Sequence, residues 1–348
     1  MPQNLYDAFK QWAIRPADER FASLDDLYDF ARQRKEHSSQ FVESLNGIQL
    51  DALNGNIFMN GTREKSYLSN WSFGQLSRLV GAPAKYLRTL PAEMAVDCMR
   101  YGMSKNDRLS KILIRDGKQG RLASSFTSES YGRIWDADII AKLRDSVADT
   151  GWHVPKSNKG YTGNSGLYAS DRDMFAFMIN DEDPVEIGDA KLGKGFFCWN
   201  SETGSATFGL TTFLYNYVCD NHIVWGADRI NELKIFHKKF APERFKQEAI
   251  PIMNEFSRSN SRSEEIKYTV DKAMTQRIGG SLEETLDWFK NRPFTRKEIE
   301  SAYQTGRLEG EDVTSLWGVI QGLTATARNM PYINKRVDLE RRAGLLLK

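Results

Sequence analysis

The sequence predicts an α+β fold in which a central, mainly antiparallel sheet lies between helical N-terminal and C-terminal regions. Apolar residues recur with helical spacing at both ends of the chain, whereas short strand-like runs separated by Gly, Asn and Asp fill the middle. No unit of about 20–50 residues repeats, which argues against a solenoid or a propeller. We expect a helical region with a small hairpin over 1–104, a β-rich core over 105–242 and a helical region over 243–348, which together can form one compact domain.

The N-terminal third carries three helix signals and one hairpin signal. Ser23 precedes an apolar stripe with helical spacing, which predicts a helix that reaches about Lys35. A second helix is expected over 72–80 and a third after Pro91, and an Asn-Gly turn at 54–55 predicts a hairpin between the first two helices. The inner face of the third helix is predicted to consist of Met94, Cys98 and Tyr101.

The middle of the chain alternates between strand signals and one helix signal. A hairpin is expected over 108–126, followed by a helix over 135–148. Four further strands are predicted over 174–179, 196–199, 207–217 and 222–225. Beyond residue 243 the apolar spacing is helical again, and the Ser/Arg-rich stretch 257–263 is the best candidate for a linker.

Composition and cysteine use indicate a folded protein of the cytoplasm. Of the 348 residues, 40% are hydrophobic and 27% are charged, which is typical of a globular chain. No apolar run approaches the length of a membrane span, and the first residues lack the pattern of a secretory signal, so we expect no membrane partner. Three widely spaced cysteines favour reduced thiols over a disulfide framework.

The common catalytic signatures are missing from the sequence: there is no Walker loop, dinucleotide-binding glycine motif, nucleophile elbow or zinc-protease motif. Asp171 and Asp173 precede an apolar strand, and Glu202 follows another. Carboxylates gathered at one sheet edge can hold Mg²⁺ or Mn²⁺ for phosphodiester chemistry. Aspartates are also common in turns that flank strands, so a purely structural role stays open for these candidate catalytic residues.

Two basic stretches indicate a partner that carries phosphate groups. Residues 100–121 contain seven Lys/Arg against two Asp, and this stretch holds the candidate nucleic-acid-binding residues Arg108, Lys111, Arg115, Lys118 and Arg121. The second stretch, which also contains His237, Arg244 and Lys246, supplies the candidates Lys234, Lys238 and Lys239, interleaved with Phe236, Phe240 and Phe245. Cations beside aromatic rings suit single strands, because bases stack while phosphates pair. The alternative is that the phenylalanines belong to the core and the lysines form its solvated rim.

The segment 196–205 is the most distinctive stretch of the sequence. Phe196 and Cys198 project to one face of the predicted strand and Phe197 and Trp199 to the other, which predicts a strand buried on both sides. The residues that follow it, 200–204, are those of a turn. Polar side chains at the end of a buried strand form either a structural turn or a functional site, and spacing does not distinguish the two.

Several segments resemble the phage- and plasmid-encoded proteins grouped under domain of unknown function 932. The similar segments are 73–91, 130–135 (Ser-Tyr-Gly-Arg-Ile-Trp), 170–175 (Ser-Asp-Arg-Asp-Met-Phe), 197–204 (Phe-Cys-Trp-Asn-Ser-Glu-Thr-Gly), 217–221 and 316–324. The resemblance runs from about Arg15 to Leu347 and implies a cytosolic product of a mobile element, with no particular reaction attached. If the polar residues of these segments mark a site, they are Asp171, Arg172, Asp173, Asn200, Ser201, Glu202 and Asn221.

The first functional hypothesis is a nucleic-acid-binding protein of phage or plasmid DNA metabolism that binds or anneals single-stranded DNA. This hypothesis requires no enzymatic activity, no metal and no other cofactor, and it allows a homo-oligomer, by analogy with annealing proteins that form rings. A first alternative is a metal-dependent phosphodiesterase or nuclease that uses Mg²⁺ or Mn²⁺. A second alternative is a non-enzymatic protein that binds a host factor through an exposed apolar patch.

Overall fold

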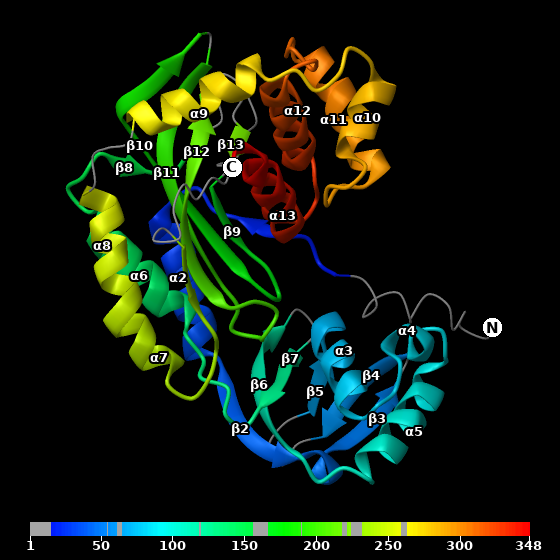
Figure 1. Cartoon of the computed structure of the whole chain (residues 1–348). Helices are drawn as coiled ribbons and strands as arrows, with labels where there is room; N and C mark the ends of the chain where they lie inside the picture. The colour runs from blue at the N-terminus through cyan, green and yellow to red at the C-terminus, as the bar shows by residue number, and fades with distance from the viewer. Residues whose placement is uncertain are drawn as a thin grey trace.

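The described strands form two sheets instead of the single central sheet expected from the sequence. The computed structural model describes residues 15–53, 55–60, 65–117, 120–155, 166–188, 190–217, 221–223, 232–258 and 263–348. Within these ranges one sheet has eight strands and the other has six. Figure 1 shows the larger sheet between two groups of helices, with the smaller sheet beyond one end of its strands.

The eight-stranded sheet is antiparallel in all its described pairs. Its main path runs in the order β1-β9-β10-β11-β12-β13, while β8 pairs with β10 and β14 pairs with β12. Its strands are β1 (Glu19–Arg20), β8 (Trp152–His153), β9 (Leu167–Ala169), β10 (Met174–Ile187), β11 (Ala190–Asn200), β12 (Phe208–Asn216), β13 (Asn221–Ile223) and β14 (Glu232–Ile235). Three of the predicted strands, 174–179, 196–199 and 207–217, form the centre of this sheet.

The six-stranded sheet has the order β2-β6-β7-β5-β4-β3, and only β5 and β7 pair in parallel. Its strands are β2 (Ser39–Ser44), β3 (Gln49–Leu53), β4 (Asn56–Asn60), β5 (Lys65–Leu68), β6 (Leu109–Gly117) and β7 (Gly120–Ser128). The predicted hairpins at 47–59 and 108–126 are therefore both present. The boundary expected at residue 104 falls between two strands of this sheet, and the three-part division stays a prediction.

The helical N-terminal region predicted from the sequence is not confirmed, because the region contributes strands β1–β5 to the two sheets. The strand β2, with the sequence Ser-Gln-Phe-Val-Glu-Ser, has neither strict alternation nor an apolar run. It becomes a strand because its backbone pairs with β6, which follows much later in the chain. A contact between distant segments therefore decides this part of the fold.

Helices cover both faces of the eight-stranded sheet and one face of the six-stranded sheet (Figure 1). In the N-terminal and middle regions these are α2 (Leu24–Glu36), α3 (Asn70–Leu79), α4 (Ala84–Leu87), α5 (Ala92–Met103) and α6 (Asp136–Val147), with a 3₁₀ turn η1 (Leu45–Gly47). The C-terminal region has α7 (Ala241–Arg244), a π-helical turn η3 (Phe245–Ala249), α8 (Ile250–Arg258), α9 (Ser263–Thr275), α10 (Leu282–Phe289), α11 (Arg296–Leu308), α12 (Leu316–Arg328), α13 (Ile333–Gly344) and η4 (Leu345–Leu347).

Strand β11 is buried on both sides, as its alternation predicted. Phe196 and Cys198 enter the core beneath α2, α6 and α8, whereas Phe197 and Trp199 enter the core beside α13. A third core, between the six-stranded sheet and α3–α5, includes Ile112. Because β11 has helices on both faces, its C-terminal end is held rigidly where it approaches the six-stranded sheet.

Two helix predictions need correction. The helix expected to begin at Ser72 begins at Asn70, because Ser69 caps it and forms a capping box with Ser72. On α5 the predicted inner face is exposed: Met94, Cys98 and Tyr101 all face outward. The buried residues of α5 are Ala92, Ala95, Val96, Met99 and Met103. This face of α5 packs on β3, so the stripe of Met94, Cys98 and Tyr101 misidentified the inner face.

No helix in the described part of the chain combines the length and the apolar character needed to cross a membrane. The candidate linker 257–263 lies partly outside the described residues.

Candidate functional site

Two tight turns bring the polar residues of the family-like segments together at one end of the central strands of the eight-stranded sheet. The first turn, Ser170–Asp173, joins β9 to β10. The Oγ of Ser170 accepts hydrogen bonds from the backbone N–H groups of Arg172 and Asp173, both at 3.0 Å, and donates one to Asp173 Oδ1 at 2.7 Å. This local bonding explains why a Ser and an Asp three residues apart close the turn.

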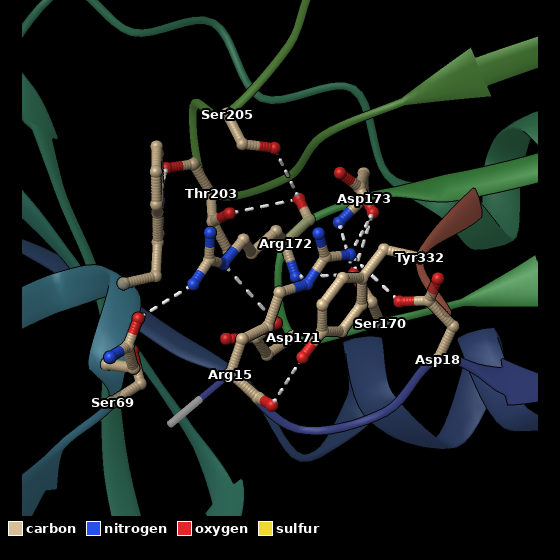
Figure 2. Close-up of polar contacts among 12 residues, drawn as sticks. Arg15, Asp18, Ser69, Ser170, Asp171, Arg172, Asp173, Thr203, Ser205 and Tyr332 are labelled. Atoms are coloured by element: carbon tan, nitrogen blue, oxygen red, sulfur yellow. Dashed lines mark hydrogen bonds and ion pairs between the residues drawn. The ribbon is translucent and has the colours of Figure 1, made fainter. Parts of the chain in front are cut away.

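The second turn, residues 200–205 between β11 and β12, is called the inter-sheet turn below. The Oγ of Ser201 accepts hydrogen bonds from the backbone N–H groups of Thr203 (3.2 Å) and Ser205 (2.9 Å). Gly204 has a φ of 82°, a left-handed conformation that glycine adopts without strain. Figure 2 shows the hydroxyl groups of Thr203 and Ser205 directed at the carbonyl oxygen of Arg172, to which they donate at 3.0 Å and 3.1 Å. The hydroxyl of Ser201 also donates to this oxygen, at 2.6 Å.

The inter-sheet turn is also bonded to the six-stranded sheet and its helix α3. The carbonyl oxygen of Thr203 accepts hydrogen bonds from Trp71 Nε1 (3.0 Å) and Gln75 Nε2 (2.8 Å). Gln75 Oε1 accepts from the backbone N–H of Phe126 in β7 at 3.0 Å, and the hydroxyl of Tyr131 donates to the carbonyl of Ser201 at 2.7 Å. These contacts join the two sheets through a single turn.

Glu202 places a buried carboxylate at the centre of this junction. One of its oxygens forms an ion pair with Arg115 of β6. The other accepts a hydrogen bond, at 2.7 Å, from the backbone N–H of Asp136, which is the first residue of α6. Asn200 Nδ2 donates to Asp136 Oδ1 at 2.7 Å, and burial raises the pKa of Asp136. All four of these side chains are at least nine-tenths buried. A buried charge of this kind persists only when it is paired and hydrogen-bonded.

A second group of charges surrounds the Ser170–Asp173 turn. Arg15 Nη2 lies 2.8 Å from Asp18 Oδ1 and 3.5 Å from Asp173 Oδ1, and its guanidinium carbon lies 4.3 Å from the centre of the Tyr332 ring (Figure 2). Burial raises the pKa of Asp173 to about 6 and also raises the pKa of Asp171. This group connects the start of the described chain to the loop before α13.

The carboxylates considered as metal ligands lie beside arginines and do not converge on one point. Each has a different cationic neighbour: Asp171 has Arg172, Asp173 has Arg15, and Glu202 has Arg115. Among the residues that the structure describes, no three His, Cys, Asp or Glu side chains are grouped so that they can hold a metal ion. The geometry therefore gives no specific support to a site that uses Asp171, Asp173 and Glu202 for metal-dependent chemistry.

The basic residues of the first stretch are divided between structural contacts and the surface. Arg115 is buried against Glu202, and Arg121 Nη1 lies 2.5 Å from Asp116 Oδ1 and 3.0 Å from the carbonyl of His37. The two residues left nearer the surface are Arg108, which is exposed, and Lys111, which is partly exposed. Lys118 lies outside the described residues.

The second basic stretch presents aromatic rings to solvent. Phe236 is 61% exposed and Phe240 is 64% exposed, so these two rings do not belong to the core, whereas Phe245, 3% exposed, does, as the alternative interpretation of the sequence expects. Lys238 and Lys239 between them are exposed, and Lys239 Nζ lies 5.7 Å from the centre of the Phe240 ring. Lys234 instead forms an ion pair, with its Nζ 2.9 Å from Glu232 Oε1. The side chain of Asn221, the last of the family-like polar residues, lies outside the described part of the structure.

The two basic stretches meet at the segment that follows β7. The backbone N–H of Gly132 donates to the carbonyl of His237 at 3.2 Å, and the rings of Tyr131 and His237 are stacked with centres 4.9 Å apart. Lys111 Nζ donates to the carbonyl of Tyr131 at 2.8 Å, which places this lysine close to the same stack. Burial lowers the pKa of His237 to about 4, so the ring is neutral at pH 7 and the lysines supply the positive charge here.

Sequence reasoning missed several residues of this site. Asp136 directly follows the family-like segment 130–135, so extending that segment by one residue would have found it. Gln75 lies inside the segment 73–91, but nothing in the pattern distinguishes it from a surface glutamine. Arg15 carried no signal at all, because its partners Asp173 and Tyr332 are far away in the sequence.

Replacing Glu202 by Gln should destabilise the protein by about 3–5 kcal/mol, because a buried Arg115 would lose its counter-charge. Glutamine keeps one oxygen for the N–H of Asp136, so the change removes the negative charge and the acceptor that faces Arg115. Urea unfolding measures the effect. The matched control is E36Q, which removes the exposed Arg32–Glu36 pair and should cost less than about 1 kcal/mol. Equal losses in the two variants would show that the Glu202–Arg115 pair does not hold the sheets together.

The raised pKa of Asp173 predicts a specific pH dependence of stability. The folded protein binds this proton more tightly than the unfolded chain, so wild-type stability should fall relative to D173N as the pH rises from about 4 to about 6. The predicted change approaches 3 kcal/mol, at about 1.4 kcal/mol per pH unit, and levels off above pH 6. Unfolding free energies of both proteins across this range give the difference. A difference that does not vary with pH would contradict the prediction.

Comparison with known proteins assigns the chain to a family. The family model described as "Domain of unknown function (DUF932)" matches residues 123–332, which is more than half of the chain and includes both turns of the site. No curated protein matches the chain, and no solved structure does. The resemblance found in the sequence is thus confirmed over these residues, and the chain belongs to the family defined by this domain of unknown function, DUF932.

Proposed function

We propose that this chain binds single-stranded nucleic acid, as a protein of phage or plasmid DNA metabolism, through what we call the basic–aromatic surface. This surface consists of Lys111, Phe236, Lys238, Lys239 and Phe240. The observation that carries the proposal is the exposure of two phenylalanine rings within five residues, with two exposed lysines between them. Exposed aromatic rings flanked by cations provide both contacts that a single strand needs, one for bases and one for phosphates.

The position of this segment supports the proposal further. Tyr131, Gly132 and His237 fix residues 236–240 against the end of the six-stranded sheet, so the rings lie on an anchored backbone. The N–H and carbonyl of Gly132 both lie within hydrogen-bond distance of His237. A Cβ on Gly132 would lie 2.0 Å from the carbonyl oxygen of Lys238, so only glycine permits this close approach. An anchored surface loses less conformational entropy on binding than a mobile one.

Stacking favours single strands over duplex DNA, because the bases of a duplex are already stacked on each other. None of the five residues of this surface is an Arg, Asn or Gln, whose planar side chains recognise base edges with two hydrogen bonds, so binding should depend little on sequence. Homo-oligomerisation, which would repeat the surface along one strand, belongs to the same proposal.

The variant F236A/F240A should bind single-stranded DNA at least tenfold more weakly than the wild type, because stacking contributes about 1–3 kcal/mol per base. The variant K238Q/K239Q should bind more weakly at about 50 mM salt. Its slope of log K against log salt should be shallower by about 0.7 for each lysine that contacts a phosphate. Fluorescence anisotropy with a labelled oligonucleotide at several salt concentrations measures both effects.

A matched control is the variant K267Q/Y268A, which removes a lysine and a 72%-exposed tyrosine from α9. It should bind as the wild type does. Absence of binding at low salt in the wild type would refute the proposal. So would an equal loss in the control and in F236A/F240A, because the exposed rings at 236 and 240 would then have no special role.

A further inference from the structure

A cavity of about 810 Å³ lies where the two sheets meet, next to the Ser170–Asp173 turn. Its walls come from α2, from β6 and β7 of the six-stranded sheet, and from the end of β9. Sites for small molecules have volumes of about 300–1,000 Å³, so this cavity is of suitable size. The apolar side chains Phe30 and Leu122 line it together with two arginines, Arg34 and Arg115, and four acidic residues, Asp18, Glu19, Asp116 and Asp171. Of the acidic residues, Asp18 is paired with Arg15 and Asp116 with Arg121, both outside the cavity lining.

Arg115 lines this cavity, and two of its hydrogen-bond donors are unused within the described part of the chain. Its side chain is 4% exposed, and one nitrogen, Nη2, pairs with Glu202. The other two, Nε and Nη1, are buried and have no hydrogen-bond partner among the described residues. A buried N–H without an acceptor is unfavourable, and in native structures such a group calls for an explanation. An acceptor on a bound molecule would provide one.

Arg34 lines the same cavity from α2 and adds a second positive charge. Its guanidinium carbon lies 5.5 Å from the centre of the Phe30 ring. Burial lowers the pKa of Arg115, and the neighbouring charge of Arg34 lowers it further. The charge of Arg34 thus disfavours the charged form of Arg115, while the carboxylates of Asp136 and Asp171 act on Arg34 in the opposite direction. An anion beside both guanidinium groups would favour their charged forms. Planar guanidinium groups are well suited to the oxygens of a phosphate or carboxylate group.

Asp171 contributes acceptors on another wall of the cavity. Its side chain is 13% exposed, and both of its carboxylate oxygens are buried without a hydrogen bond from any described residue, although Arg172 Nε lies 3.6 Å away. Donors and acceptors without partners therefore line the same cavity. This combination indicates a ligand with an oxyanion at one end and an N–H or O–H group at the other.

We propose that this cavity binds a phosphate-bearing small molecule of about the size of a mononucleotide. Arg34 and Arg115 hold the phosphate group, and Asp171 accepts a hydrogen bond from a donor group elsewhere on the molecule. The site is separate from the basic–aromatic surface, because none of the five residues of that surface lines the cavity. It therefore represents a second binding function of the same chain.

The test uses the full chain and isothermal titration calorimetry in a chloride buffer of constant ionic strength. The probes are inorganic phosphate, the four deoxynucleoside 5′-monophosphates and the same deoxynucleosides without phosphate. A monophosphate should bind the wild type more tightly than inorganic phosphate does, and the deoxynucleosides should bind at least tenfold more weakly than their monophosphates. The variant R34Q should lose at least tenfold in affinity for the monophosphate.

The matched control is R32Q, also on α2, where the arginine is exposed and paired with Glu36. It should bind the probes as the wild type does. The variant D171N separates the two ends of the ligand, since it should weaken binding of the monophosphate without weakening binding of inorganic phosphate. Thermal unfolding of each variant without ligand confirms that it is folded before binding is measured.

Three outcomes would overturn the proposal. In the first, neither phosphate nor any monophosphate binds the folded wild type. In the second, R34Q binds as tightly as R32Q. In the third, monophosphate binding is lost in K238Q/K239Q but kept in R34Q, which would place the phosphate on the basic–aromatic surface.

Discussion

The buried carboxylate of Glu202 is the interaction on which the rest of this structure depends. It lies at the end of β11, pairs with Arg115 of the six-stranded sheet and accepts the first backbone N–H of α6. Ion pairs of this kind rarely add much stability over an apolar contact, but breaking one is costly because a buried charge is left alone. The pair therefore specifies how the two sheets meet, since few other arrangements would satisfy both charges.

The junction between the sheets positions both proposed binding regions. The segment after β7 passes through Tyr131, which bonds to the inter-sheet turn with its hydroxyl and stacks on His237 with its ring. The same residue thus ties the junction to residues 236–240. On the other side of the junction, Arg115 and the Ser170–Asp173 turn form walls of the cavity. Contacts that hold the fold together also place the groups available to ligands.

Counting charges along the chain overestimated the surface available to a polyanion. The first basic stretch contains seven cationic residues, yet Arg115 and Arg121 are bound to carboxylates in the fold. In the second stretch, Lys234 lies beside a carboxylate, whereas Lys238 and Lys239 are exposed. Two of its phenylalanines are also exposed, although large apolar side chains are usually buried. Exposure of large aromatic rings is therefore the more informative signal, and it becomes visible only when the chain is folded.

The sequence by itself determined the elements that depend on neighbouring residues. The cap at Ser23, the glycine turns of the two hairpins and the two-sided burial of β11 all follow from local bonding or from alternation. The sequence also identified both turns of the candidate site by their polar residues. Only the tertiary structure decided that β2 is a strand, which face α5 buries, and that Glu202 faces Arg115. These features require contacts between segments far apart in the chain, and no local pattern of residues encodes which partner a strand edge or a buried charge will meet.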